Sequence, residues 1–433
     1  MTSDAAEERA GTAGVVQFLR AHPAFGRLWA ARAVSFLGDS VGLVALLLYV
    51  AQHEKSGLAV ALLMIAGDFA PNLLSPLAGA VADLAGRAGA RWLMPSCEMA
   101  QAAVIVAIAL ALPGLPVLLP LVAARATIAT VFQAASRSVV PSLVPGSQLA
   151  KANAALGLGT NGLDVIGPLL AAALLPWLTI SGLLLLDAAT FAVSAALLLT
   201  LPAVTHGAAV SPAAAVSPAT TVSRTATASA REPFLAGAKE GVTYIWRQRY
   251  LRVIAIGFCA VVLFNAVDDV ALVYLARDSL HAPAWGMSLL YAGVGAGLLI
   301  GFASLTRFPH RIPVVPLLLA GYLVSSLGNL LTGTAWAIAA AFGLQCVRGL
   351  GLSAMDTAHD TLIQRIVPAD LLGRVFANVY GAVSLAAGLS YLLGGLLLDA
   401  TNPRVTLIVA GAGGIAVTPI VAWRLRAAAR HGP

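Results

Sequence analysis

The chain contains one stretch twice, and this duplication constrains its fold more than any other feature. Residues 125–151 read RATIATVFQAASRSVVPSLVPGSQLAK, and residues 348–374 read RGLGLSAMDTAHDTLIQRIVPADLLGR. The two copies align without a gap, so that Arg125 matches Arg348 and each copy contains a Val-Pro pair at the same position. An internal repeat of this kind predicts a protein built from two equivalent halves.

Most of the chain is expected to lie in lipid. Of its 433 residues, 59% are hydrophobic and only 10% are charged, whereas soluble domains carry charge on about 25% of their residues. The basic residues behind the net charge of +7 are scattered between apolar runs. This is the pattern of a membrane protein rather than of a nucleic-acid-binding surface. We therefore expect contact with membrane lipid and none with nucleic acid.

Apolar runs of membrane-spanning length recur along the sequence. About 20 apolar residues are needed to cross the hydrocarbon core as a helix, and a helix satisfies its own backbone hydrogen bonds there. The predicted fold class is an all-α membrane protein with twelve transmembrane helices in two six-helix, pseudo-symmetric halves. The predicted spans are 27–51, 58–81, 92–112, 116–139, 153–176, 180–201, 251–276, 285–306, 312–333, 335–358, 374–399 and 404–424.

The basic residues also predict the orientation of the chain. They are concentrated in the connections on the side of the N-terminus, whereas only Lys55, Arg277 and Arg404 lie in connections on the other side. By the positive-inside rule, both termini are cytoplasmic. The predicted localisation is the plasma (inner) membrane, crossed many times.

Between the halves lies a segment of different composition. Residues 202–233 are rich in Ala, Ser, Thr and Pro, which predicts a flexible cytoplasmic linker. After it, Phe234, Ala238, Val242 and Ile245 recur at helical spacing and predict an interfacial helix. The predicted parts are a tail and approach helix at 1–26, bundles at 27–201 and 250–425, the linker with its helix at 202–249, and a tail at 426–433.

The connection between the second and third spans carries a spaced motif. Residues 79–91 place Gly79, Asp83, Gly86, Arg87 and Arg91 in the pattern G-x-x-x-D-x-x-G-R-x-x-x-R. We interpret the segment as a short cytoplasmic turn. Together with the repeat and the predicted spans, this motif resembles the signature loop of the major facilitator superfamily. The resemblance implies a conformational latch, in which the carboxylate and the arginines stabilise an outward-open state.

Two further stretches are similar to one branch of this superfamily. FGRLWAARAVSFLGDS, at residues 25–40, and VPxxxLAxANA, from Val144 to Ala154, resemble bacterial exporters that include enterobactin-type siderophore and macrolide efflux proteins. Gly167-Pro168 matches the end of the family's antiporter motif, although Ala129 stands where the family has a glycine. The resemblance implies export, driven by antiport.

Polar and charged residues inside the spans form the candidate site. An ionisable group at bilayer depth costs about 2.5–3.5 kcal/mol to insert, so each should face a partner or an aqueous cavity. Arg32, Ser35 and Asp39 share one helical face. The resemblance implies that the first, fourth, seventh and tenth spans line a central cavity. The candidate substrate- and proton-binding residues are Asp39, Asp268, Asp269, Arg125, Arg348, Arg32, Asp164, Asn265, Asp68 and Asp356.

Proton coupling requires a carboxyl group that alternates between its neutral and ionised forms. Burial favours the neutral form, and a nearby arginine favours the ionised form. Our hypothesis is that Asp39, Asp268 and Asp269 form the proton and substrate site. Arg125 and Arg348 would hold one of these acids ionised until a proton or substrate displaces the pair, although each arginine could instead brace two helices.

Other residues in the spans receive structural interpretations. Glu98, Asp187 and Asp399 are interpreted as helix caps or solvated groups, and His359 as a weak titration candidate. A stripe of small residues in the eighth span is interpreted as a packing seam, because small residues one turn apart let helices approach closely. It consists of Gly293, Gly297 and Gly301.

These features predict a secondary transporter that exports a small amphipathic organic molecule by alternating access and proton antiport. The resemblance and the acids favour a cationic or neutral substrate, protons as the second partner, and a monomer. No G-x-x-x-x-G-K-[ST] loop is found, and no enzymatic activity or cofactor is expected. Two alternatives stay open: a proton-coupled importer or uniporter of a small solute, and a receptor or scaffold that no longer transports.

Overall fold

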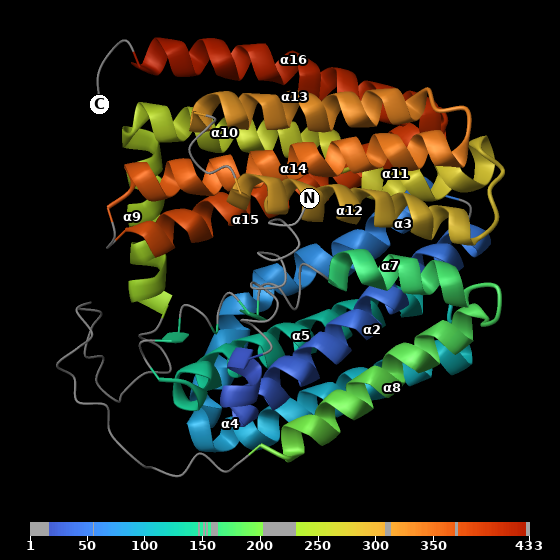
Figure 1. Cartoon of the computed structure of the whole chain (residues 1–433), viewed down its shortest axis with the longest axis vertical. Helices are drawn as coiled ribbons and strands as arrows, with labels where there is room; N and C mark the ends of the chain where they lie inside the picture. The colour runs from blue at the N-terminus through green and yellow to red at the C-terminus, as the bar shows by residue number, and fades with distance from the viewer. Residues whose placement is uncertain are drawn as a thin grey trace. The chain divides into compact units, whose positions relative to one another are not determined.

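The computed structural model describes residues 17–54, 56–145, 148–149, 152, 155–156, 163–201, 231–307, 313–368 and 371–429. Every regular element in these ranges is a helix (Figure 1). Ten helical segments among them are long and apolar enough to cross a membrane. They are α2 (Pro23–Glu54), the Gly89–Ala111 part of α4 (Ala70–Ala111), α5 (Leu115–Leu143), α8 (Ile180–Leu199), the run of α10 (Arg249–Asn265), α11 (Asp268–Tyr274) and η4 (Leu275–Ser279), α12 (Trp285–Arg307), α13 (Val314–Gly333), α14 (Ile338–Ile366), α15 (Leu372–Ala400) and α16 (Pro403–Ala429).

Two predicted spans are built from shorter pieces. The span at 58–81 consists of α3 (Gly57–Met64), a π-helical turn η1 (Ile65–Phe69) and the first part of α4. The span at 153–176 contains α7 (Leu163–Leu174), and residues 157–162 ahead of it lie outside the described part. The all-α membrane fold predicted from the sequence is confirmed.

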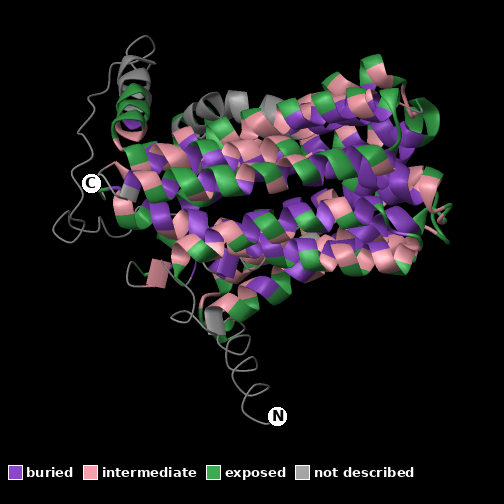
Figure 2. Ribbon diagram, turned by 90° about the horizontal axis from the view of Figure 1, so that it is seen from above, coloured by how far each residue is buried: buried purple, intermediate pink, exposed green. Residues whose placement is uncertain are grey.

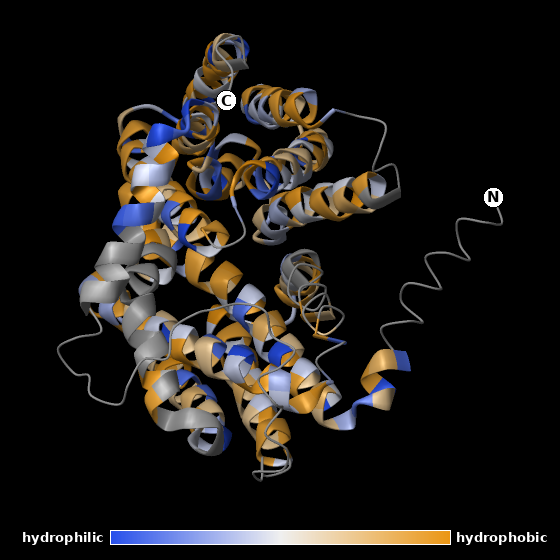
Figure 3. Ribbon diagram, turned by 90° about the vertical axis from the view of Figure 1, so that its left-hand side faces the viewer, coloured by the Kyte–Doolittle hydropathy of each residue, from blue (hydrophilic) through white to orange (hydrophobic). Residues whose placement is uncertain are grey.

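The surface of the helices is that of a lipid-embedded protein. Large apolar side chains such as Leu110, Leu385, Ile420 and Trp423 are more than half exposed. Figure 2 shows exposed residues along the outer faces of the helices, and Figure 3 shows that hydrophobic residues dominate the helical ribbons. In water such exposure would be unfavourable, whereas lipid is an apolar solvent for these side chains.

The predicted turn between the second and third spans is wrong. The backbone is helical through residues 82–91, because α4 extends from Ala70 to Ala111 without a break. Alanine, leucine and arginine, which favour helix, outweigh the glycines of this segment, and no proline interrupts it. The side chains of Asp83 and Arg87 lie outside the described residues. Arg91 is described, and its guanidinium lies over the Trp92 ring.

The chain divides into two compact units. Unit 1 contains α2, α4, α5, α7 and α8, together with Pro283–Ala292 at the start of α12. In it, α4 packs against α5 and α8, and α2 against α7 and α8. Unit 2 contains the rest of α12, α9 to α11 and α13 to α16, together with Ser56–Ala61. In it, α13 packs against α14 and α16, and α10 against α15 and α16.

The segment predicted to be an interfacial helix is helical and forms α9 (Arg231–Arg247). It begins within the predicted linker, whose residues 202–230 lie outside the described part. Glu240 of α9 forms an ion pair with Arg374 of α15, the basic residue that ends the second copy of the repeat. Tyr244 Oη donates to the Ile366 carbonyl oxygen over 3.2 Å. These contacts attach α9 to the cytoplasmic ends predicted for the unit 2 spans.

Asp399, at the end of α15, caps the N-terminus of α3. Its carboxylate accepts hydrogen bonds from Ser56 Oγ (2.7 Å) and from the backbone N–H groups of Gly57 (2.5 Å) and Leu58 (3.2 Å). The prediction that Asp399 is a cap is therefore confirmed. The first N–H groups of a helix have no partner within the helix, and a carboxylate also interacts favourably with the helix dipole.

Loss of this cap is expected to lower stability measurably. Asp399→Ala should lower the free energy of unfolding by about 1–2 kcal/mol, whereas Asp399→Asn should retain most of the stability because an amide oxygen can still accept these hydrogen bonds. Thermal unfolding of the detergent-purified protein measures both variants. Equal melting temperatures for the alanine and asparagine variants would show that the cap contributes nothing.

Candidate functional site

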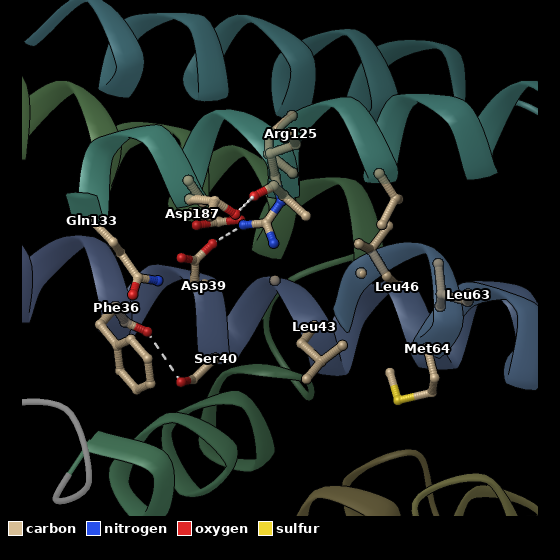
Figure 4. Close-up of a pocket in the computed structure, with 17 residues that line it drawn as sticks. Phe36, Asp39, Ser40, Leu43, Leu46, Leu63, Met64, Arg125, Gln133 and Asp187 are labelled. Atoms are coloured by element: carbon tan, nitrogen blue, oxygen red, sulfur yellow. Dashed lines mark hydrogen bonds and ion pairs between the residues drawn. The ribbon is translucent and has the colours of Figure 1, made fainter. Parts of the chain in front are cut away.

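The central feature of unit 1 is an ion pair between Arg125 of α5 and Asp39 of α2. Both side chains keep some solvent exposure, 18% for the arginine and 26% for the aspartate. Figure 4 shows them pointing toward one another, with Asp187 of α8 beside them. The first and fourth predicted spans therefore bring their charges together, as the sequence-based hypothesis requires.

Two cavities of unit 1 meet at Asp39. One of about 370 Å³ extends along α2 toward Leu46 and Met64 and has Arg125 in its wall. A second of about 280 Å³ is lined by Arg32 and Arg137. Both cavities share four residues, which are Phe36, Asp39, Ala129 and Gln133. Asp39 is thus accessible from both, which is the position required of a group that binds a mobile ion or a solute.

Two acids that the sequence did not place in the site lie beside this pair. Asp187 is 1% exposed and lines the larger cavity, and Glu98 of α4 is fully buried. Ser35 Oγ donates to Glu98 Oε2 over 3.1 Å. The interpretation of Asp187 and Glu98 as caps or solvated groups is therefore wrong. Asp187 lies seven residues into α8, or about 10 Å from its start, which is too deep for either role.

Arg32 occupies the smaller cavity. Its Nη1 donates to Ser136 Oγ of α5 over 2.5 Å, and the Arg137 guanidinium lies close to it. Glu98 is the acid that interacts with Arg32 electrostatically. The predicted polar face of α2 is confirmed as a face that reaches both α4 and α5, because Ser35 contacts Glu98 one turn further along the helix.

Unit 2 contains a second, more buried ion pair. Arg348 Nη2 of α14 lies 2.8 Å from Asp268 Oδ2 of α11, and the two side chains are 6% and 0% exposed. The neighbouring Asp269 accepts a hydrogen bond from Tyr391 Oη of α15 over 3.0 Å. Because Arg125 and Arg348 are matched in the repeat, each unit pairs the arginine of its fourth predicted span with an aspartate of its first.

A break in the seventh predicted span places these acids. Helix α10 ends at Asn265, and α11 begins at Asp268. The Asp269 N–H bonds to the Ala266 carbonyl oxygen (3.2 Å), so the Asn265 carbonyl oxygen is released from the regular helix pattern. Asn329 Nδ2 of α13 donates to it over 3.2 Å and also to Asn265 Oδ1 over 3.0 Å. The break is therefore stabilised by side chains, and both acids lie in the first turn of α11.

The remaining predicted residues are distributed as follows. Asp356 is partly buried in α14, two turns beyond Arg348, and interacts electrostatically with it. Asn265 is buried and donates to Ser326 Oγ over 3.0 Å. The side chains of Asp68 and Asp164 lie outside the described residues, as does most of the predicted latch. His359 is buried and stacks on Phe258, with ring centroids 4.1 Å apart.

Repeated helical units, lipid-compatible outer faces and an intramembrane ion pair in each unit define a multi-pass membrane transport protein. Comparison with known families agrees. The chain belongs to the Major Facilitator Superfamily, whose model matches residues 28–342. Members of this family are transporters of small molecules, not enzymes, and typically function as monomers; this chain is such a transporter.

The chain is similar to proteins of several kinds within this fold. It is 26% identical over 398 residues to the uncharacterised MFS-type transporter YfiS of Bacillus subtilis (strain 168), covering 89% of each chain. Among solved structures, the nucleoside transporter NupG has a TM-score of 0.72 at 12% identity, covering 93% of this chain and 99% of that one. A bacterial homologue of the iron transporter ferroportin has a TM-score of 0.69 at 16% identity, with 93% and 98% covered.

Proposed function

We propose that this transporter exports small amphipathic organic molecules from the cytoplasm in exchange for protons. It would do so by alternating access in the plasma membrane, with both termini in the cytoplasm. The similarity of residues 25–40 and 144–154 to bacterial efflux proteins supports export. One proton that moves through a potential of 100 mV supplies about 2.3 kcal/mol, which is sufficient to concentrate an uncharged solute about fiftyfold.

The observation that carries the proposal is the position of Asp39 between two cavities while it pairs with Arg125. A proton or a cationic solute that reaches Asp39 competes directly with the guanidinium for the carboxylate. Such competition couples proton binding to solute binding, because binding of one changes the affinity for the other. If the ion pair only held α2 and α5 together, Asp39 would not need to be accessible from a cavity.

The larger cavity favours an amphipathic solute. Its volume of about 370 Å³ lies within the range of small-molecule sites. Its wall combines apolar side chains such as Leu43, Leu46 and Met64 with the carboxyl groups of Asp39 and Asp187. Apolar surface favours an organic body, and an excess of acids over arginines favours a cationic or neutral head group. A lipophilic organic cation such as ethidium is the appropriate probe.

We also propose that the motif at 79–91 acts as the latch of the outward-open state, through Gly79, Asp83, Gly86, Arg87 and Arg91. The helical backbone of this segment supports a latch in which Asp83 and Arg87 act together. On a helix, Asp83 and Arg87 are separated by four residues and lie on one face, where an acid N-terminal to a base forms a favourable pair. Their spacing therefore allows a joint contact with another helix end.

The transport proposal predicts the effect of neutralising Asp39. In proteoliposomes with an imposed pH gradient, the wild-type protein should accumulate ethidium against its gradient, and an uncoupler should abolish this. Asp39→Asn should lower gradient-driven accumulation at least tenfold, because the site then lacks the carboxylate for which a proton or a cation competes with Arg125. The double variant Asp268→Asn with Asp269→Asn tests the unit 2 acids in the same assay.

The matched control is Asp278→Asn, which removes an exposed acid that pairs with its neighbour Arg277. It should transport as the wild type does. Accumulation in inside-out vesicles and depletion in right-side-out vesicles identifies export, and the opposite pattern identifies import. Full gradient-driven accumulation by Asp39→Asn would remove this residue from the mechanism.

A further inference from the structure

We propose that Asp187 is the proton-carrying carboxyl of unit 1, and that it shares the single guanidinium of Arg125 with Asp39. In the state described here, Arg125 pairs with Asp39 while Asp187 is protonated. When a cation binds Asp39, the guanidinium pairs with Asp187 instead and the proton leaves. The consequence for transport rests on the proposed antiport, whereas the protonation state of Asp187 does not.

The first support is the burial of Asp187. Its side chain points toward Arg125 and Asp39 in Figure 4 and lines the same cavity. Only 1% of its surface is exposed, and Oδ1 has no hydrogen-bond partner among the described residues. An ionised carboxylate is unfavourable when one of its oxygens is buried without a hydrogen-bond donor, whereas a protonated carboxyl group is tolerated.

The second support is the close contact between this carboxyl group and two glycines of α2. Gly38 and Gly42 lie one turn apart and face α8, and a Cβ atom at either position would collide with the Asp187 carboxyl oxygens. The absence of side chains at both positions therefore lets the carboxyl group pack directly against the α2 backbone. Because Asp39 follows Gly38 in the chain, this contact with the glycines holds Asp187 close to the ion pair.

The third support is the count of charges around Asp187. The groups that face it are Asp39 from α2, Arg125 from α5 and Glu98 from α4. Arg125 can neutralise one carboxylate, and in this state that carboxylate is Asp39. Arg32 interacts with Glu98 and Ser136, and Arg137 lies close to Arg32 rather than among the groups that face Asp187. A second ionised acid at Asp187 would leave a buried charge without a counter-charge.

In unit 2, the second acid beside the ion pair accepts a hydrogen bond. There, Asp269 lies near the Arg348–Asp268 pair and accepts a hydrogen bond from Tyr391 Oη over 3.0 Å. A donated hydrogen bond favours the ionised form of a carboxyl group. Asp187 Oδ1 receives no such bond among the described residues, so this contribution to the ionised form is missing at that atom.

The exchange is balanced in charge and in atoms. Before a cation binds, Asp39 carries −1, Arg125 carries +1 and Asp187 is neutral. After a cation binds Asp39, Arg125 remains +1 and Asp187 becomes −1, so that the cation is compensated. The only bond broken is the O–H bond of Asp187, and the proton passes to water in the cavity. One proton is therefore released for each monovalent cation bound.

Infrared spectroscopy of the detergent-purified protein tests the protonation state without any substrate. Protonated carboxyl groups and carboxylates absorb at separate frequencies. In the difference spectrum of wild type minus Asp187→Asn at neutral pH, we expect the loss of one protonated-carboxyl band. Loss of a carboxylate band instead would show that Asp187 is ionised and would overturn the proposal.

A second variant keeps the test decisive if Asp187→Asn does not fold. In Asp39→Asn the competing carboxylate is gone and the guanidinium of Arg125 is free to pair with Asp187, which faces it, so Asp187 should lose its proton. The spectrum should then lack one protonated-carboxyl band although Asp187 is still present. If Arg125 does not move to Asp187, Asp39→Asn loses only a carboxylate band, and the proposal is wrong.

Transport separates a coupling role from a structural role. In Asp187→Asn, ethidium accumulation driven by a pH gradient should fall at least tenfold, and the ethidium transport that remains should no longer respond to the pH gradient. A purely structural role would lower the transport rate but leave its response to the pH gradient unchanged. If the wild type shows no gradient-driven accumulation, the proposed antiport fails while the infrared result still decides the protonation of Asp187.

Discussion

Arg348→Met is expected to destabilise unit 2 by about 3–5 kcal/mol, because it leaves the fully buried Asp268 without its counter-charge. The methionine side chain fills a similar space and introduces no polar group, so the loss reports on the charge. The measurement is the melting temperature and the folded fraction of the detergent-purified protein. Much less folded protein should be recovered than from the wild type.

The double variant Arg348→Met with Asp268→Asn isolates the pair. Removing both charges should restore more than half of the lost stability, since no unpaired buried charge remains. Arg277→Met, which affects an exposed pair with Asp278, is the control and should lower stability by less than about 1 kcal/mol. Additive losses in the double variant would show that Arg348 stabilises the unit through packing rather than through Asp268.

Gly297→Leu is the second substitution with a large expected effect. A Cβ atom at Gly297 of α12 would overlap the Cys346 carbonyl oxygen of α14, and one at Gly349 would overlap the Val294 carbonyl oxygen. The two backbones therefore touch at this point, which confirms the predicted packing seam. A leucine must push the helices apart, at a loss of about 3 kcal/mol or more.

Gly343→Ala is the matched control for this substitution. Gly343 lies on α14 as well, but nothing approaches its Cβ position within 4 Å. Alanine should therefore leave the melting temperature unchanged or raise it by the equivalent of about 0.5–1 kcal/mol, because alanine favours helix over glycine. Equal effects of the two substitutions would show that the helices do not approach as closely as described.

Much of the fold follows from the sequence alone. An apolar run of about 20 residues must form a helix in lipid, because only a helix satisfies its own backbone hydrogen bonds there. The ten segments of spanning length accordingly lie within the apolar runs of the sequence. The turn within 79–91 was not predictable in this way. Charged and small residues indicate a segment outside the lipid, but they do not say whether its backbone turns or continues as a helix, and here it continues.

The candidate site was predicted in part. Arginines inside apolar runs must find acids, so the matched positions of Arg125 and Arg348 indicate two ion pairs. The pairing of acids with arginines depends on the rotation of each helix and on the break after Asn265. The spacing of residues in the sequence predicts neither. Asp187 was missed because its depth in α8 was underestimated. The available signal was the pair Gly38 and Gly42, which leaves space opposite α2 for a polar group.

The arginine–aspartate pair occurs in both units, whereas the acids on the third and sixth predicted spans of the first half have no counterparts on the matching helices of the second. The counterparts of the third and sixth predicted spans in the second half are α13 and α16, and neither contains an aspartate or a glutamate. Because the two arginines are matched in the repeat, an arginine at this position is common to both halves, whereas the further acids lie on different helices: Glu98 on α4 and Asp187 on α8, but Asp269 on α11 and Asp356 on α14. A duplicated transporter can thus keep one shared charge and still place its titratable groups differently in its two halves.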